Sequence, residues 1–369
     1  MIQQRGEPLA GIVEDWTNAK LRWQAWWQCE IHDRVLIAVT APKDGVAPPQ
    51  IPPVDPQTQW TDADFMVRRA LETVRTTYYG GEALPSCMNP VSVGFAPLVG
   101  CQPHYTDGAM WGDPAPAGPD GHPALDVWRA SPWRDWMLAT TRTFVANSHG
   151  RYFTIPFWGN HAGDELAAVC GIEQLMIDMA NDPGWVAGAV KQMSDAMIEL
   201  QESYWQCVLP EVTGMEGSLN HEQCWSPART RVFDCDVSCM VSARAYREVF
   251  LPPLLETMQY VDHRVYHLDG PGALHHLDTL LGVRELHAIQ WQPGAGHNQS
   301  ILDWLPVIRR VQAAHKAIVL DVLDPKEIDA LLQEVSPEGV YLRTTCPSES
   351  EARRLVEHLA RRPQKGGRR

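Results

Sequence analysis

The sequence alternates between short apolar or β-branched runs and segments whose apolar residues recur at helical spacing. The runs cover residues 34–40, 90–95, 151–158, 214–220, 263–269, 285–291, 316–322 and 339–345. Helical patterns occupy residues 62–79, 133–147, 164–209, 242–261, 301–314, 325–334 and 348–360. Alternation of this kind predicts a parallel sheet covered by helices, and eight such units favour closure into a (β/α)8 barrel.

We therefore expect an α/β fold with a single TIM barrel domain over residues 1–360. Residues 1–32 are predicted to form a helical segment that packs on the barrel. The remaining residues 361–369, RRPQKGGRR, read as a basic and disordered tail. A length of 369 residues suits one large barrel or two ordinary domains, so the strand count decides between them.

Composition excludes several classes of partner. The formal net charge of -14 argues against nucleic acid and anionic membranes, which leaves a small-molecule substrate as the expected ligand. The chain contains no apolar run of about 18 residues and no signal pattern at its start. The nine cysteines form no CxxC pair, which fits a reducing compartment. We expect a cytoplasmic protein.

Polar residues gather where the predicted strands end. In a (β/α)8 barrel the chemistry lies at the carboxyl ends of the strands, which we call the mouth. The residues predicted to carry catalysis there are His161, His221, Glu222, His267 and Asp269. Asp321 is predicted to lie at the same end of the barrel, after the seventh run. Those predicted to contact substrate are Trp158, Asn160, Gln290, Trp291 and Arg343.

His267 and Asp269 are two residues apart in an extended run, so their side chains point the same way. Such a pair can hold a metal or move a proton. With Cys346 at the end of the eighth run they form a nitrogen, oxygen and sulfur set that suits zinc. Three structural alternatives remain: Asp269 caps the next helix, Asn160 and His161 cap theirs, and Cys346 is a buried free thiol.

Three segments resemble the uroporphyrinogen decarboxylase superfamily. They are FWGNHAGDELAAVCGIEQLMIDMANDPGWV (157–186), VSARAYREVFLPPLLETMQ (241–259) and YHLDGPGALHHLDTLLGVRELHAIQWQPGAG (266–296). The similarity runs from about residue 150 to 360 and is fainter in LRWQAWWQCEIHDRVLIAVTAP (21–42). The superfamily forms a single (β/α)8 barrel, which agrees with the strand count. The arginine-rich N-terminal motif of true uroporphyrinogen decarboxylases is missing here.

The resemblance is nearer to the zinc-dependent methyltransferases of the superfamily, which move a methyl group between a corrinoid protein and a thiol. It implies that His267 and Cys346 match two of their three zinc ligands, whereas Asp269 stands where they have cysteine. A corrinoid-binding DxHxxG motif is absent, so any corrinoid is expected on a separate protein. Two rivals stay open: a metal-free decarboxylase in which Arg343 or His161 grips a carboxylate, and a non-catalytic subunit that docks a corrinoid protein.

Overall fold

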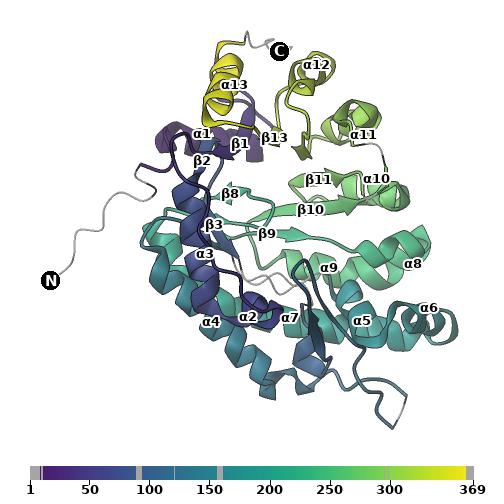
Figure 1. The fold of residues 1–369 in the computed structure, drawn as a ribbon. Coiled ribbons are helices and arrows are strands. Elements are labelled where there is room, and N and C mark those ends of the chain that lie inside the picture. The colour runs from purple at the N-terminus through teal and green to yellow at the C-terminus, as the bar shows by residue number, and fades with distance from the viewer. Residues whose placement is uncertain are drawn as a thin grey trace.

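A computed structural model of the chain describes Leu9 and residues 11–88, 94–119, 121–155, 161–294, 296–297 and 299–362. A seven-stranded sheet lies at its centre, in the order β2-β1-β13-β12-β11-β10-β9 (Figure 1). Its strands are β1 (Leu36–Pro42), β2 (Thr77–Gly81), β9 (Thr230–Phe233), β10 (His263–Asp269), β11 (Ala288–Gln292), β12 (Ala317–Asp321) and β13 (Val340–Thr345).

Neighbouring strands of this sheet are parallel, apart from β2, which runs antiparallel to β1. β1 and β13, the first and last parallel strands along the chain, lie next to each other. Pairing of the first strand with the last is a feature of (β/α)8 barrels, in which the sheet closes on itself. The mixed α/β architecture is therefore compatible with a TIM-barrel-like fold.

Three further ladders contain two strands each. β3 (Ser86–Met88) runs parallel to β6 (Phe153–Ile155), whereas β4 (Pro103–Tyr105) with β5 (Met110–Gly112) and β7 (Ser218–Leu219) with β8 (Trp225–Ser226) are antiparallel. Within the described residues, no ladder joins β3 and β6 to the large sheet, so a closed barrel is not observed. Parts of the predicted runs at 90–95 and 151–158 lie outside the described residues.

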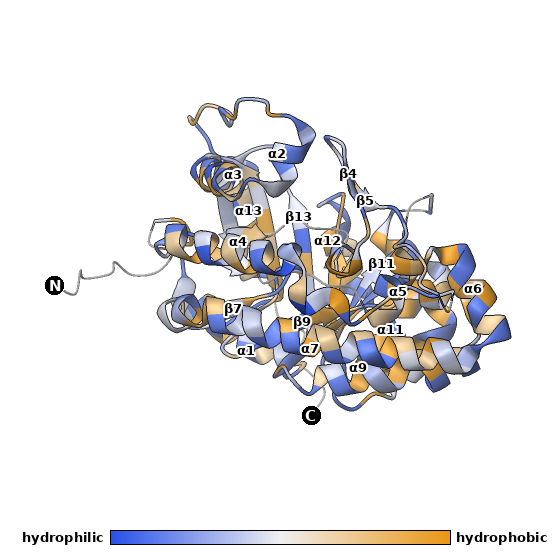
Figure 2. Ribbon diagram, turned by 90° about the horizontal axis from the view of Figure 1, so that it is seen from below, coloured by the Kyte–Doolittle hydropathy of each residue, from blue (hydrophilic) through white to orange (hydrophobic). Residues whose placement is uncertain are grey.

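The helices follow the predicted alternation, and apolar (orange) and polar (blue) residues alternate along them in Figure 2. They are α1 (Trp16–Trp27), α2 (Pro56–Thr61), α3 (Ala63–Thr76), α4 (Pro132–Ser148), α5 (Ala162–Cys170), α6 (Ile172–Asn181), α7 (Pro183–Gly214), α8 (Ala243–Ala245), α9 (Leu251–Met258), α10 (Leu277–Leu281), α11 (Leu305–Ala313), α12 (Glu327–Glu334) and α13 (Glu349–Arg361). Among the described residues, none of these helices has the length and apolar character needed to span a bilayer.

Both faces of the sheet are buried, which explains why its strands read as apolar runs. Successive side chains of a strand point to opposite faces. One face packs in the same apolar cluster as α5, α7, α9 and α11, and includes Ile37, Val39, Leu268, Ile289, Trp291, Ile318, Leu320 and Leu342. The other face forms a separate cluster with the tryptophans of α1, and includes Leu36, Ala38, Val265, Ala288, Ala317, Val319 and Tyr341. We call this second face the inner face.

Helix α1 covers the amino-terminal ends of the strands. Trp23 is fully buried, and its ring lies 4.7 Å from that of Tyr341 on β13 and 5.5 Å from that of Trp26. The indole nitrogen of Trp27 donates to the Trp225 carbonyl at 2.9 Å. We call Trp23, Trp26, Trp27 and Tyr341 the floor. The predicted helical segment at 1–32 thus contains α1 as an apolar plug.

Two sequence expectations are corrected. The predicted strand at 214–220 is instead the end of α7, a turn and the two-residue β7, and the strand beside β10 is β9. Gly217 lies just before β7, where a Cβ would come within 2.3 Å of the Ser226 carbonyl oxygen of the hairpin. Residues 77–79, predicted to be helical, belong to β2.

Candidate functional site

Five polar side chains form a closed ring of contacts at the mouth, and we call them the polar ring. His267 and Gln290 are register partners on β10 and β11, and Asp321 and Arg343 are register partners on β12 and β13. Each lies two positions beyond an apolar inner-face residue of its strand, so alternation turns all four side chains inward. The fifth member, Glu222, comes from the turn between β7 and β8.

The contacts of the polar ring are mostly charge-assisted. Arg343 binds Asp321 through two nitrogens, Nε to Oδ1 at 2.8 Å and Nη2 to Oδ2 at 2.6 Å. Its third nitrogen, Nη1, lies 2.5 Å from Glu222 Oε2. Burial by itself lowers the pKa of Arg343, but the carboxylates of Glu222 and Asp321 raise it above its ordinary value. The guanidinium is therefore held as a cation by two acids.

Gln290 and His267 complete the polar ring. Gln290 Nε2 donates to Asp321 Oδ2 at 3.3 Å, and His267 Nδ1 hydrogen bonds to Gln290 Oε1. His267 Nδ1 also lies 3.6 Å from Glu222 Oε1, which closes the circle. Burial lowers the pKa of His267, yet Glu222, Asp234 and Asp236 together raise it above the usual histidine value. Carboxylates thus favour a positive charge at this position, carried by a proton or a metal.

His267 also belongs to a group that can bind a metal. Ligand atoms of Asp236, His267 and Asp269 all lie within 4.8 Å of one another. Burial raises the pKa of Asp236, with Asp269 adding to the rise and His267 opposing it. One imidazole nitrogen and two carboxylates are ligands that zinc and harder divalent cations accept. Asp236 follows β9 and was not among the residues predicted from sequence.

Asp234 is a buried carboxylate beside this group, with an exposed fraction of 1%. Its Oδ1 accepts the backbone N–H of His161 at 2.7 Å, whereas Oδ2 has no hydrogen-bond partner among the described residues. Burial and the nearby Asp236 raise the pKa of Asp234 to about 6, against the opposing effect of His267. A buried carboxylate oxygen with no donor adds to the negative field at the mouth.

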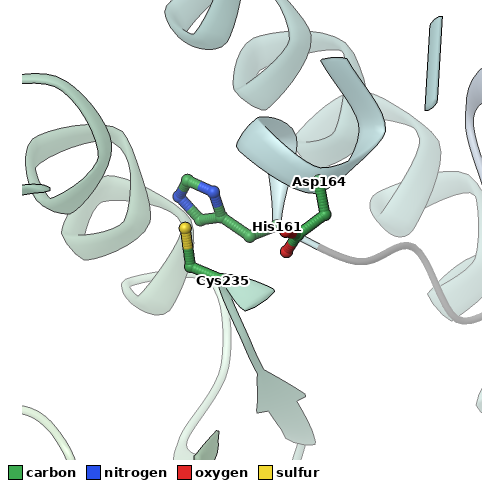
Figure 3. A group of neighbouring side chains, drawn as sticks. All are labelled: His161, Asp164 and Cys235. Carbon is green, nitrogen blue, oxygen red and sulfur yellow. The ribbon is translucent and has the colours of Figure 1, made fainter. Parts of the chain in front are cut away.

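A second group with suitable ligand types is His161, Asp164 and Cys235, shown in Figure 3. The hydrogen bonds that His161 and Asp164 make within the protein argue against a metal at this group. His161 Nδ1 accepts the Gly163 N–H at 2.9 Å, and Nε2 lies 3.0 Å from the Phe250 carbonyl. Both oxygens of Asp164 accept backbone N–H groups, of Asp236 at 3.1 Å and Val237 at 2.7 Å. Burial lowers the pKa of His161 to about 4. The group fastens the start of α5 to the segment after β9.

His161 was predicted to be catalytic, and the structure makes it the N-cap of α5, which was the structural alternative. His221 is largely buried next to Glu222, its Nε2 4.0 Å from Glu222 Oε1. Burial lowers the pKa of His221 well below its ordinary value, and the positive His267, Arg231 and Arg343 lower it further. His221 therefore stays neutral.

Cys346 does not join His267 and Asp269. Neither group of potential metal ligands in the described residues includes it. Its backbone N–H donates to the Thr40 carbonyl at 2.8 Å, and its side chain, 8% exposed, belongs to the apolar cluster on the helix-covered face. Burial, with Glu351, raises the pKa of the thiol. Asp236, and not Cys346 as predicted from the sequence, is the third member of the group that contains His267 and Asp269.

Trp291 is also displaced from the mouth. It is fully buried on the helix-covered face, where its ring lies 4.9 Å from that of Trp304. Alternation explains this, because Gln290 faces inward and its neighbour must face outward. Trp158 and Asn160, predicted to contact substrate, lie outside the described residues.

The signal for the missed acids was present in TRVFDCD, residues 230–236. This short β-branched run followed by two acids resembles the other strand ends. The fourth strand is predicted at 214–220 instead, so the two acids are not among the predicted site residues. Moving that strand to β9 puts Asp234 and Asp236 at the mouth, next to His267 on β10. A four-residue strand gives a weaker pattern than the seven residues of β10.

Comparison with known proteins adds information about the fold. No family model and no curated protein matches the chain. Among solved structures, the chain is similar to a methyltransferase from Methanosarcina mazei, with a TM-score of 0.61 and 12% sequence identity. The match covers 93% of this chain and 98% of that one. At this identity the likeness concerns the architecture, and it extends over nearly the whole of both chains.

Proposed function

We propose that the protein is a methyltransferase of the uroporphyrinogen decarboxylase-like type, which transfers a methyl group to a small acceptor at the mouth of a closed (β/α)8 barrel. The observation that carries the proposal is the meeting of Asp236, His267 and Asp269 within 4.8 Å at the ends of β9 and β10. The likeness to a methyltransferase structure over 93% of the chain supports it. The pairing of β1 with β13 supports closure.

In this proposal Asp236, His267 and Asp269 hold a divalent metal, with zinc the first candidate. The metal's contribution is Lewis acidity, which lowers the pKa of an acceptor thiol or hydroxyl. The methyl donor is a methylcorrinoid carried by a separate protein. The acceptor would lose its proton and use the freed electron pair to bond to the methyl carbon, while the cobalt–carbon bond breaks and its electron pair stays on the cobalt. Two carboxylates in place of two thiolates make the ligand set harder, so manganese or iron(II) also fits.

The residues of the polar ring keep His267 in place. Glu222 and Asp321 occupy all three nitrogens of Arg343, so this cation has a positioning role in the proposal. The same contacts weaken the decarboxylase alternative, which needs Arg343 or His161 to grip a substrate carboxylate. Both side chains are already engaged within the protein.

The non-catalytic alternative also loses support. It required a mouth lined by tryptophans without convergent titratable groups. Trp291 is fully buried on the other face of the sheet, and several charged or titratable side chains meet at the mouth, among them Glu222, Asp236, His267, Asp269, Asp321 and Arg343.

Metal content tests the proposal. The full chain is purified after growth with added zinc, manganese and iron, and its metals are measured by mass spectrometry. We expect about one divalent metal per chain, which is lost in His267→Ala and kept in the control Cys346→Ala. Methylcobalamin and a small thiol then serve as substrates. A wild-type chain without metal that transfers no methyl group would contradict the proposal, whereas loss of metal in Cys346→Ala would restore the sulfur as a ligand.

A further inference from the structure

The orientation of the Gln290 side chain can be worked out from its neighbours. Gln290 is 1% exposed, so its amide must find partners within the protein. It lies between Asp321, on one side, and His267, on the other. An amide has a donor end and an acceptor end, and the two partners decide which end faces which.

The contacts between Arg343 and Asp321 determine which end of the Gln290 amide faces Asp321. A guanidinium cannot lose its proton in a protein, so Asp321, bound through two of its nitrogens, remains an ionised acceptor. Asp321 therefore takes its third hydrogen bond from the Gln290 NH2 group. The carbonyl oxygen Oε1 of Gln290 must then face His267, and a carbonyl oxygen only accepts. The hydrogen of that bond has to be on Nδ1 of His267.

We propose that Gln290 is a positioning residue which, anchored by Asp321 and Arg343, keeps the hydrogen of His267 on Nδ1 and leaves the Nε2 lone pair for a cation. The hydrogen bond at one ring nitrogen fixes what the other nitrogen can do. One nitrogen of the same ring lies within 4.8 Å of a carboxylate oxygen from both Asp236 and Asp269, and Nε2 is the nitrogen that the hydrogen bond to Gln290 does not use. The orientation of the ring follows from hydrogen bonds alone, and only the identity of the cation depends on the proposed function.

The chain Arg343, Asp321, Gln290 and His267 spans four adjacent strands, β13 to β10. Each strand contributes one inward side chain, so this chain of hydrogen bonds depends on strand register and not on a flexible loop. A change at Gln290 should therefore act on His267 without removing any candidate ligand. Substitution of a residue that hydrogen bonds to a metal ligand commonly changes metal affinity by about 10–100-fold.

The test compares two substitutions with opposite chemistry. Gln290→Met keeps a similar length but gives no acceptor, whereas Gln290→Glu keeps an acceptor oxygen toward His267. A matched control is Gln312→Met on α11, where the amide donates to the Ser336 carbonyl at 2.7 Å and takes no part in the polar ring. The full chain carries 15N-histidine, and long-range 1H–15N spectra report the tautomer at a pH where the ring is neutral. His267→Gln identifies the signal.

We expect the Nδ1–H tautomer in the wild type, Gln290→Glu and Gln312→Met, and a shift toward Nε2–H in Gln290→Met. In zinc titrations, Gln290→Met should bind about 10–100-fold more weakly than the wild type, and Gln312→Met equally well. A wild type with its hydrogen on Nε2 overturns the inference, and so does a Gln290→Met chain with unchanged tautomer and affinity. If Gln290→Met does not fold, the wild type and Gln290→Glu still decide. If the wild type has the Nδ1–H tautomer but binds no metal, the proposed function is contradicted and the positioning role of Gln290 stands.

Discussion

Strand β10 begins with His263 and has a second histidine, His267, two residues before its other end, and the two histidines have opposite surroundings. His263 lies against the floor, with its ring 4.5 Å from that of Trp27, and burial lowers its pKa. His267 lies at the mouth, where carboxylates raise its pKa in spite of burial. Their neighbours differ in the same way, since apolar Val265, Ala288, Val319 and Tyr341 precede His267, Gln290, Asp321 and Arg343 by two positions.

The difference shows that the two ends of a single strand have different roles. At the floor, side chains exclude water and contribute to the free energy of unfolding through apolar burial. At the mouth, two positions further on, side chains of both charges are gathered at a cost in desolvation, at the end of the strands where barrel enzymes have their active sites. Substitutions at the two ends should therefore differ in what they change.

The largest effect on stability is expected at the floor. Trp23→Ala removes a fully buried indole and its contacts with Trp26 and Tyr341, and should lower the free energy of unfolding by about 3–5 kcal/mol. Urea denaturation measures it. Zinc affinity of the chains that remain folded should be unchanged. A loss of affinity without a loss of stability would show that the two ends are not independent.

At the mouth, Arg343→Met leaves the carboxylates of Glu222 and Asp321 without their cation. We expect the free energy of unfolding, measured by urea denaturation, to fall by about 3 kcal/mol, because the ion pairs of Arg343 with Glu222 and Asp321 are largely but not wholly buried. Adding Glu222→Gln and Asp321→Asn to the same chain should recover part of this loss. If the triple variant is less stable than Arg343→Met alone, uncompensated charge in the polar ring does not explain the loss of stability.

Titration of the histidines compares the two ends directly. NMR should show His267 above the usual pKa of about 6.5 and His263 below it, with His287 near the floor at about 4. A raised pKa gives stability that is complete below 6.5 and is lost as pH rises through the folded value. A lowered pKa gives stability that is complete above 6.5 and is lost as pH falls toward 4. His267→Gln and His287→Gln should thus change the pH dependence of unfolding in opposite directions.

The smallest effect is expected for Cys346→Ala. The thiol is part of an apolar cluster and joins no metal-ligand group among the described residues, so its loss should cost about 1 kcal/mol. Thermal unfolding and metal analysis measure the two consequences. A chain that keeps its fold but loses its metal would place a sulfur at the mouth after all.

The sequence was sufficient for the strand and helix alternation, and β10 has the bounds that were predicted. It also identified the four strand-borne members of the polar ring and Glu222, because polar residues at the ends of apolar runs are visible without a structure. It was insufficient where a choice of face decided the outcome. Trp291 and Cys346 lie at strand ends like the others, but a shift of one residue turns a side chain to the opposite face.

The central claim is that a divalent cation binds between Asp236, His267 and Asp269. Crystals of the full chain grown with zinc, with data collected on both sides of the zinc absorption edge, test it most directly. The account predicts one anomalous peak in contact with His267 and with a carboxylate oxygen from each aspartate. A peak at Cys346, or zinc bound only on the protein surface while these three side chains stay free of it, would contradict the account.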